Sequence, residues 1–336
     1  MNFVGIDLHK KSISLCVVDQ SRAVLRRKSL SCADPNSIHE FFASLGAFQA
    51  VVEATSSYEW LWRLIEPLAN RLVLAHPYKL RVIAESTKKS DKLDAQVLAE
   101  FLALDMIPQA YRPTPRQRAH RRLVRHRLFV LDEQKAVRCR IRAILSEFNA
   151  DIPKLFTQRG LQLLQEIPLD PQARFVVDRL TAQWRSLEEE VHTIEEELQT
   201  FAEQAPTAEA EARAVLKSIP RVGPVTINVV LSELGDIRRF RSAKQVCAYA
   251  GLVPGYRESG GKRKDLGITK QGSPRLRWAL IETAWRMVLH VPRWRAVFER
   301  LAEQRGKKRA ITAVARRLLC VMTAMLKTGQ AYRLAA

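Results

Sequence analysis

The segment FVGIDLHKKSISLCVVDQSRAVLRRKSL, residues 3–30, has the pattern of three consecutive β-strands. A short apolar strand covers Phe3–Ile6 and ends at Asp7. Period-two alternation then predicts strands over Ser12–Val18 and Val24–Leu30, with a polar turn between them. This segment decides the fold class, because three consecutive strands followed by alternating helices and strands indicate an α/β domain.

The next elements complete an α/β domain. In chain order we predict helix, strand, helix, strand and helix, over residues 35–45, 50–52, 58–68, 71–75 and a stretch that begins near residue 91. Asp34 is the predicted N-cap of the first of these helices. The order β-β-β-α-β-α-β-α predicts a domain of ribonuclease H-like type, which we place at residues 1–107.

Four acids in this domain are placed for chemistry. Asp7 ends the first strand, Glu53 ends the fourth, and Asp91 and Asp94 share one face of the helix after the fifth. Because strand ends converge on one edge of an α/β sheet, a helix docked there would bring all four carboxylates together. Such a cluster repels itself unless a divalent cation neutralises it, and oxygen-only ligands suit Mg²⁺ or Mn²⁺. A pair of these ions is the usual clamp for phosphoryl transfer.

Each acid alone also has a structural interpretation. Asp7 could cap a turn and Glu53 could pair with an arginine. Asp91 could be a helix N-cap, with Asp94 in the favourable first turn. Taken together, in an acid-poor domain of this strand order, the four favour a metal site.

The charge balance indicates the partner. The chain has 336 residues, enough for two or three domains, with 47% apolar residues, a net charge of +20 and a pI near 10.2. Such an excess of cations predicts a polyanion, most simply nucleic acid, with an anionic membrane surface as the other option. Apolar runs are too short to span a bilayer, the start lacks a signal-peptide pattern, and the five cysteines are scattered. We therefore expect a cytoplasmic, nucleoid-associated protein with no membrane partner.

An arginine-rich helix follows the first domain. Between residues 112 and 142 there are 11 lysines and arginines against two acids, and apolar residues recur at helical spacing. This predicts a basic helical linker over residues 108–150 that follows nucleic-acid phosphates, with Arg121, Arg122 and Arg125 as candidate contacts. A solvated helix face is the alternative.

A long acidic helix comes next. Residues 175–201 carry two glutamate runs and no helix breaker, and apolar residues recur at steps of three and four, at Leu180, Trp184, Leu187, Val191, Ile194 and Leu198. The pattern predicts a coiled-coil arm within residues 151–210. An acidic arm would not bind DNA, so we expect it to space domains or to pair with a second copy.

The remaining residues, 211–336, predict a mostly helical unit. LKSIPRVGPVTI, residues 216–227, has the helix-hairpin-helix pattern, in which Gly223 allows a tight turn and backbone amides grip phosphate. A plain helical turn is the alternative.

A glycine-rich, basic loop is predicted at residues 257–272, where glycines would let the backbone approach phosphates. Its candidate nucleic-acid contacts are Arg257, Lys262, Arg263, Lys264 and Lys270. Ser259 could contact phosphate through its hydroxyl or act as a nucleophile, since the nearby cations would favour an alkoxide. No His–Asp pair accompanies it at recognisable spacing, so a hydrolase triad is not indicated.

Two motif sets carry a family resemblance. GIDLHK, VVEATSSYEW and KKSDKLDAQVLAEF, which contain the four acids, resemble the DEDD-type, RuvC-like domain of one transposase family. The segment from SIPRVGPVTI through GYRESGGKRK to GITKQGSPRLRWAL resembles the second, serine-bearing transposase domain of that family. The family is the insertion-sequence one-ten family, related to the Piv DNA invertases. The resemblance covers nearly the whole chain and is weakest at residues 149–183.

The resemblance implies a complete architecture and activity. The fold would be a RuvC-like α/β domain, a coiled-coil arm and a helical, helix-hairpin-helix transposase domain. The activity would be DNA recombination that excises and inserts the element, guided in many members by a bridge RNA. Mg²⁺ on Asp7, Glu53, Asp91 and Asp94 and a covalent phosphoserine link at Ser259 are the implied chemistry. Donor and target DNA would be partners of a dimer or tetramer whose arm joins subunits that share active sites.

Two other functions stay open. One is a metal-dependent, structure-specific nuclease, similar to a junction resolvase, in which the second domain only grips DNA. The other is a non-catalytic nucleic-acid-binding protein whose acids are structural.

Overall fold

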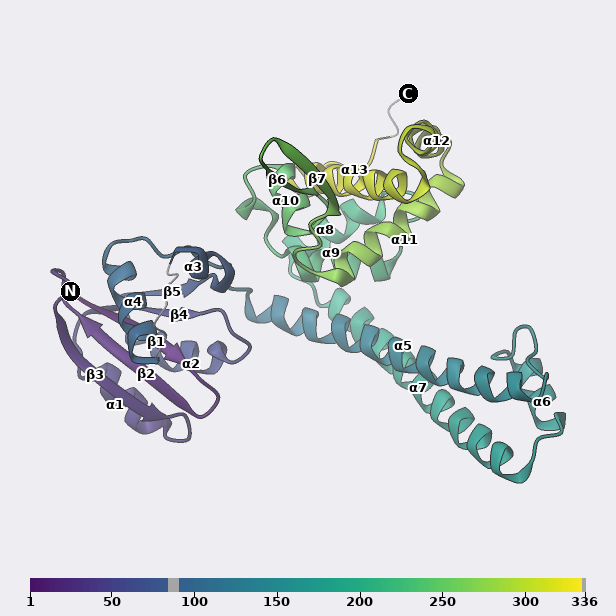
Figure 1. The fold of residues 1–336 in the computed structure, drawn as a ribbon, viewed down its shortest axis with the longest axis horizontal. Helices are drawn as coiled ribbons and strands as arrows, with labels where there is room; N and C mark the ends of the chain where they lie inside the picture. The colour runs from purple at the N-terminus through teal and green to yellow at the C-terminus, as the bar shows by residue number, and fades with distance from the viewer. Residues whose placement is uncertain (84–90, 334–336) are drawn as a thin grey trace. The chain divides into compact units, whose positions relative to one another are not determined.

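The computed structural model describes residues 1–83 and 91–333, and the side chains at 81–83, 91–93, 262 and 263 lie outside that description. The chain divides into two compact units, Met1–Arg112 and Pro113–Ala336 (Figure 1). None of the helices in the described ranges has both the length and the hydropathy that a membrane crossing requires.

Unit 1 contains a five-stranded mixed sheet. Its strands are β1 (Asn2–Leu8), β2 (Ser12–Val18), β3 (Val24–Ser31), β4 (Phe48–Glu53) and β5 (Arg71–Ala75). The spatial order is β3-β2-β1-β4-β5, with β1, β2 and β3 antiparallel and β1, β4 and β5 parallel. The five predicted strands are confirmed, and β1 extends past Asp7 to Leu8.

Helices cover both faces of this sheet. They are α1 (Pro35–Ala43) and α2 (Tyr58–Ile65) on one face, and α3 (Pro77–Ile83) and α4 (Asp91–Ala103) on the other. Asp34 caps α1, because its Oδ1 accepts a hydrogen bond from the Ser37 amide at 3.0 Å, as predicted. The short helix α3 was not predicted.

The alternation along β1 decides which residues meet which helices. Val4, Ile6 and Leu8 pack in the core under α1 and α2. Phe3 packs in the core under α4. Gly5 and Asp7 follow it at alternate positions of the strand, so Asp7 also faces the α4 side.

Two long helices of unit 2 form an arm. They are α5 (Pro115–Glu147) and α7 (Pro171–Glu203), which lie side by side, with the short α6 (Gln158–Glu166) at the far end (Figure 1). The predicted basic linker and the predicted acidic arm are thus the two halves of one helical hairpin. His126 Nε2 lies 3.4 Å from Glu190 Oε1, and Arg127 pairs with Glu195, so the opposite charges of the two helices meet within one chain.

The rest of unit 2 is a helical body that carries one β-hairpin. Its helices are α8 (Thr207–Lys217), α9 (Pro224–Leu234), the 3₁₀ turn η1 (Ile237–Arg239), α10 (Ala243–Tyr249), α11 (Pro274–His290), α12 (Pro292–Arg305) and α13 (Lys307–Thr328). The hairpin consists of β6 (Pro254–Ser259) and β7 (Lys262–Ile268). The mostly helical prediction is confirmed, whereas the predicted glycine-rich loop is largely this hairpin.

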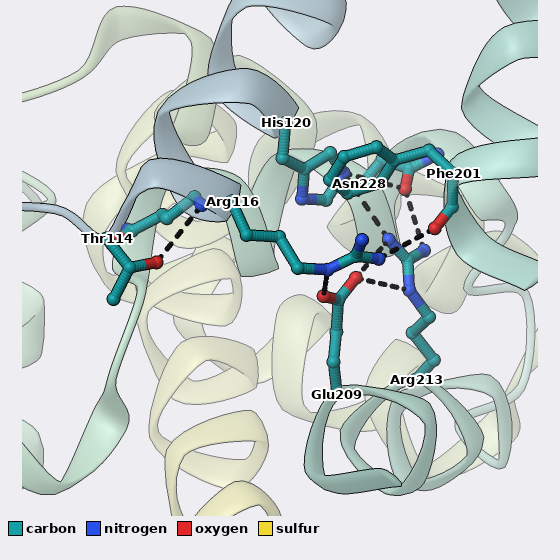
Figure 2. A network of polar contacts seen from close by, with 8 residues as sticks. Thr114, Arg116, His120, Phe201, Glu209, Arg213 and Asn228 are labelled. Carbon is teal, nitrogen blue, oxygen red and sulfur yellow. Dashed lines mark hydrogen bonds and ion pairs between the residues drawn. The ribbon is translucent and has the colours of Figure 1, made fainter. Parts of the chain in front are cut away.

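A half-buried polar network joins the base of the arm to the helical body (Figure 2). The carboxylate of Glu209 on α8 accepts hydrogen bonds from Arg116 on α5, at 2.5 Å, and from Arg213, at 2.8 and 3.0 Å. Arg116 also donates to the Phe201 carbonyl at 2.7 Å. Although burial opposes ionisation, these two arginines lower the pKa of the Glu209 carboxyl. The network therefore fixes α5, α7 and α8 to one another.

His120 completes this network in its neutral form. Its Nε2 lies 3.0 Å from Asn228 Oδ1, which also accepts from Arg213, and its ring stacks on Phe201 with centroids 5.0 Å apart. The residue is 3% exposed. Burial is the main cause that lowers the pKa of His120 to about 4, and the charge of Arg213 adds to it.

We expect unit 2 to lose stability when the pH falls from 6.5 to 4. The unfolded chain takes up a proton at His120 near pH 6.5, while the folded chain does so only near pH 4, so acid favours unfolding. A lowering of the pKa from 6.5 to about 4 corresponds to about 3 kcal/mol. Urea unfolding of the wild type and of His120→Gln across this range measures it, because the glutamine amide does not titrate. An equal loss in both proteins would assign the effect to other groups.

Candidate active site

Asp7 and Glu53 lie on adjacent parallel strands. The register pairs Ile6 of β1 with Val52 of β4, and Asp7 and Glu53 are the next residues of these two strands. The two acids therefore lie beside each other at the same edge of the sheet. Val51 packs on the α4 side, and Glu53, two residues later, therefore faces that side too. The convergence of these two acids that the sequence predicted is present in the strand register.

Gly5 allows α4 to reach this edge. A Cβ atom at residue 5 would lie 1.9 Å from the Ala95 carbonyl oxygen and 2.6 Å from the Ala99 amide nitrogen. The backbone of α4 thus rests directly on β1, two residues before Asp7. Because Asp94 immediately precedes Ala95, this close contact brings Asp94 to the acidic edge. Gly5 was missed by sequence reasoning, although a glycine inside a strand is a known mark of close backbone approach.

We expect Gly5→Ala to loosen α4. The added methyl group meets backbone atoms that cannot rotate away, so α4 must shift, at a stability loss of about 1–3 kcal/mol. Hydrogen–deuterium exchange should become faster in α4, and Gly255→Ala is a matched control because its nearest neighbouring atom is 3.7 Å from the new Cβ. Unchanged protection of α4 in Gly5→Ala would contradict the close contact.

The charges of Asp7 and Asp94 both act on Glu53. Burial is the first cause that raises the pKa of the Glu53 carboxyl, and the charges of Asp7 and then Asp94 raise it further. Glu53 is half-buried, the Asp7 side chain is 19% exposed, and Asp94 is exposed. The cluster is therefore open to solvent on the Asp94 side, where a ligand could enter.

His9 is a neighbour of the cluster that sequence reasoning missed. Its Nε2 lies 3.0 Å from Asp7 Oδ2, and its side chain is 44% exposed. The spacing of two residues in GIDLHK was the available signal, since alternate residues of an extended chain share a face.

The donor set suits a divalent cation. Carboxylate oxygens are the ligands that Mg²⁺ and Mn²⁺ prefer. A cation would relieve the repulsion that, together with the larger effect of burial, raises the pKa of Glu53. Among the described side chains, which leave out Asp91, no set of three acids, histidines or cysteines is close enough to hold an ion as it stands. The side chain of Asp91 lies outside the described residues, and its predicted role stays a prediction.

Ser259 lies at the tip of the β6–β7 hairpin. It is exposed and directly precedes Gly260 and Gly261, whose φ angles of 55° and 73° form the tight two-residue turn. In the antiparallel register it faces Lys262, and Arg257 faces Lys264. Because strand residues alternate, Ser259 and Arg257 share one face of the hairpin.

Cations and open backbone surround the serine. Arg257 and Lys264 are exposed, whereas the predicted contacts at Lys262 and Arg263 concern side chains outside the description. A Cβ at Gly260 or Gly261 would meet nothing within 4 Å, so a ligand backbone can come close there. The arrangement can present a hydroxyl to an anion.

The base of this hairpin is held rigidly by packed backbone. Gly272, with φ 80°, lies so close to the Tyr249 carbonyl oxygen that a Cβ would be 1.9 Å away. Arg277 donates to the carbonyls of Ala250, Gln271 and Gly272 at 3.1–3.2 Å. Gly272 therefore has a structural role, unlike the open glycines at the tip. Lys270, a predicted contact, is exposed beside it with φ 55°.

The predicted contacts on α5 have different surroundings. Arg121 donates to the carbonyls of Ser232 and Glu233 at 2.7 and 2.8 Å, and Arg125 forms a two-point pair with the carboxylate of Glu233 at 3.0 and 3.1 Å. These bonds give both arginines a structural role at the end of α9. Arg122 is exposed. The nucleic-acid role of all three stays a prediction.

The turn of the helix-hairpin-helix pattern differs in detail. Gly223 is the N-cap of α9 with an extended backbone, φ −97°, and the left-handed residue of the turn is Arg221, with φ 64°. A Cβ at Gly223 would meet nothing within 4 Å, so its surroundings are open. Its predicted contact with phosphate is untested.

A sheet edge that gathers acids and a basic unit that presents an exposed serine are consistent with an enzyme that processes nucleic-acid strands. A family model described as Transposase, DEDD_Tnp_IS110, matches residues 4–150, and one described as Transposase IS116/IS110/IS902 family matches residues 213–299. The chain therefore belongs to the IS110 family of insertion-sequence transposases, which recombine DNA. Its DEDD domain indicates dependence on a divalent metal.

Curated relatives agree with this family. The transposase for insertion sequence element IS1111A of Coxiella burnetii is 28% identical over 100% of this chain and 92% of its own length. The transposase for IS1328 of Yersinia enterocolitica is 27% identical over 91% of this chain and 87% of its own. The pilin gene-inverting protein of Moraxella lacunata is 24% identical over 98% and 97%. The predicted relation to DNA invertases is confirmed.

Proposed function

We propose that this transposase exchanges DNA strands through two reactive sets, one in each unit: carboxylates that hold a divalent cation and a serine nucleophile. The observation that carries the proposal is the acidic edge, where Asp7 and Asp94 act on the half-buried Glu53. Like-charged groups gathered on a sheet edge are unfavourable without a cation, and their oxygens suit Mg²⁺ or Mn²⁺. Asp91 joins this set by prediction.

The acids have a defined task in this proposal. Asp7, Glu53 and Asp94, with Asp91, would hold the cation, which would supply positive charge for a phosphate group of DNA. His9, 3.0 Å from Asp7, would orient that carboxylate. A shell of this kind keeps a ligand in the correct direction.

Ser259 has the other task. Its Oγ attacks a DNA phosphorus atom, an Oγ–P bond forms and one P–O bond of the DNA backbone breaks. The oxygen of the leaving strand takes up a proton, and the hydroxyl of an incoming strand later attacks the same phosphorus and releases the serine. Phosphodiester bonds are conserved throughout, so the exchange needs no external energy source. Exposure at the hairpin tip and the cations Arg257 and Lys264 support this role.

The test is a covalent adduct. DNA incubated with protein and Mg²⁺ should give a complex that survives denaturant, and peptide mapping should locate the attached nucleotide at Ser259. Attachment at another residue, or strand exchange without any adduct, would contradict the serine mechanism. DNA cutting that depends on metal but forms no adduct and rejoins no strands would favour the structure-specific nuclease instead.

Guidance by a bridge RNA and assembly into a dimer or tetramer belong to the proposal as predictions. The net charge of +20 supports nucleic-acid partners in general. Sequencing of RNA that co-purifies with the protein tests the guide, and light scattering of the DNA complex tests the assembly. Recombination by nuclease-treated protein would count against the guide.

A further inference from the structure

A groove of about 1020 Å³ lies within unit 2, between the β6–β7 hairpin and the helices α12 and α13. On the hairpin side, residues 265–268 of β7 form its wall (Figure 1 shows the hairpin next to α13). The cations that line it are Lys270, Arg305, Lys308, Arg309, Arg316 and Arg317. Among its described lining residues Asp265 is the one acid, and it pairs with Arg309 at 3.4 Å. The groove therefore has a strong positive charge.

Two of these cations lie at the start of α13, where positive charge is unfavourable. Lys308 and Arg309 lie in its first turn, which contains no acid, and Gly306 offers no side-chain cap. The N-terminal end of a helix is itself partly positive, so cations there repel it. A phosphate group bound beside these side chains would offset the repulsion. The arrangement is thus built for an anion.

The interior of the groove is apolar. Leu252, Leu301, Ala310 and Ala313 line it together with the cations. A duplex presents only its charged backbone to such a surface, because its bases are stacked inside. An unpaired strand offers both parts, phosphates for the cations and base faces for the apolar interior. The volume is close to the upper end of small-ligand pockets, roughly 300–1,000 Å³, and so suits a few nucleotides of one strand.

The groove also begins close to the serine. Lys262 is opposite Ser259 in the register, and Asp265, at the groove, is three residues further along β7. At about 3.3 Å per residue the separation along the strand is about 10 Å.

We propose that this groove holds an unpaired DNA strand beside the phosphate that Ser259 attacks, with phosphates at Arg305 and Lys308 and bases over the apolar interior. The inference rests on the proposed function for its choice of DNA, because the serine on the same hairpin acts on DNA. Binding itself does not require the serine reaction, so the two can fail separately.

The test is a salt-dependent binding measurement with matched double variants. Arg305→Gln/Lys308→Gln removes two exposed groove cations, and Arg286→Gln/Arg300→Gln removes two exposed arginines of α11 and α12 that do not line it. The affinity for a labelled single-stranded DNA oligonucleotide, measured by fluorescence anisotropy, should fall by about tenfold for each lost charged contact in the groove variant. The slope of log affinity against log salt should decrease by about 1.4, while the control keeps most of its affinity. Thermal midpoints of both variants check that they fold.

Three results would overturn the inference. The first is an equal loss in the groove and control variants, which would make the effect general charge. The second is an equal loss for duplex DNA, which would mean that the groove grips a duplex. The third is a loss for an RNA of the same sequence but not for the DNA, which would assign the groove to RNA. A DNA adduct at Ser259 that forms in the control but not without the groove cations would support the placement of the strand.

Discussion

Ser259→Ala is expected to abolish covalent attachment to DNA and to lower strand exchange by about 10³-fold or more, since loss of a nucleophile removes the first chemical step. The side chain is exposed at the tip of the hairpin, and the adjacent Gly260–Gly261 turn sets the local backbone. Alanine should therefore leave the fold and the affinity for DNA unchanged. A quenched-flow assay of strand joining, together with gel detection of the adduct, measures both effects.

The matched control is Ser186→Ala, an exposed serine on α7 in the same unit. It removes the same hydroxyl from a surface without a predicted reaction and should exchange strands at the wild-type rate. Full strand joining by Ser259→Ala would remove the serine from the mechanism. Cleavage without joining in that variant would leave a metal-dependent nuclease as the activity of the chain.

The sheet of unit 1 was accessible from sequence because local patterns specify it. Val4, Ile6 and Leu8 alternate with Phe3 and Asp7, so both the strand and the face of the acid follow from a period of two. The docking of this helix at the acidic edge was predicted, but its close backbone contact with Gly5 was not accessible in the same way. Gly5 is an ordinary weak position in a strand until the Ala95 carbonyl is known to lie against it.

The arm and the hairpin show two further limits. The apolar stripe of α7, with Trp184, Ile194 and Leu198, predicted a partner helix but could not identify α5, because the spacing of one helix reports only its own buried face. The hairpin lacks apolar alternation, since β6 is largely exposed. The remaining signal was Gly260–Gly261, a dipeptide typical of two-residue hairpin turns.

The arginines of α5 have structural partners that local charge does not reveal. Arg121 and Arg125 lie in a basic segment, and both donate to the end of α9, where Glu233 is 2% exposed. A buried carboxylate far along the chain leaves no trace in the local sequence around its partner. The lining of the basic groove, by contrast, was present in the sequence as RGKKRAITAVARRLL, but its function depends on the hairpin opposite.

Mg²⁺ is expected to stabilise unit 1, and Glu53→Gln is expected to remove that effect. At a Mg²⁺ concentration of 100 times the dissociation constant, the wild type should gain about 2.7 kcal/mol. Glu53 is half-buried, and the charges of Asp7 and Asp94 repel its carboxylate, so the neutral glutamine relieves this repulsion. The variant should therefore be more stable than the wild type without metal and less stable than the wild type with it. Hydrogen exchange of β1 and β4, with and without Mg²⁺, measures both.

The effect of Glu53→Gln on stability should thus have opposite signs with and without Mg²⁺, which distinguishes a metal ligand from an acid that only stabilises the fold. An acid that stabilised the fold by its own contacts would lower stability when replaced, whether or not Mg²⁺ was present. Glu40→Gln, on the exposed side of α1, is the control and should keep the full Mg²⁺ effect. If Glu53→Gln also kept it, Glu53 would not be a ligand. If Glu53→Gln were destabilised to the same extent with and without the ion, the acidic edge would be structural and the proposed metal site would be wrong.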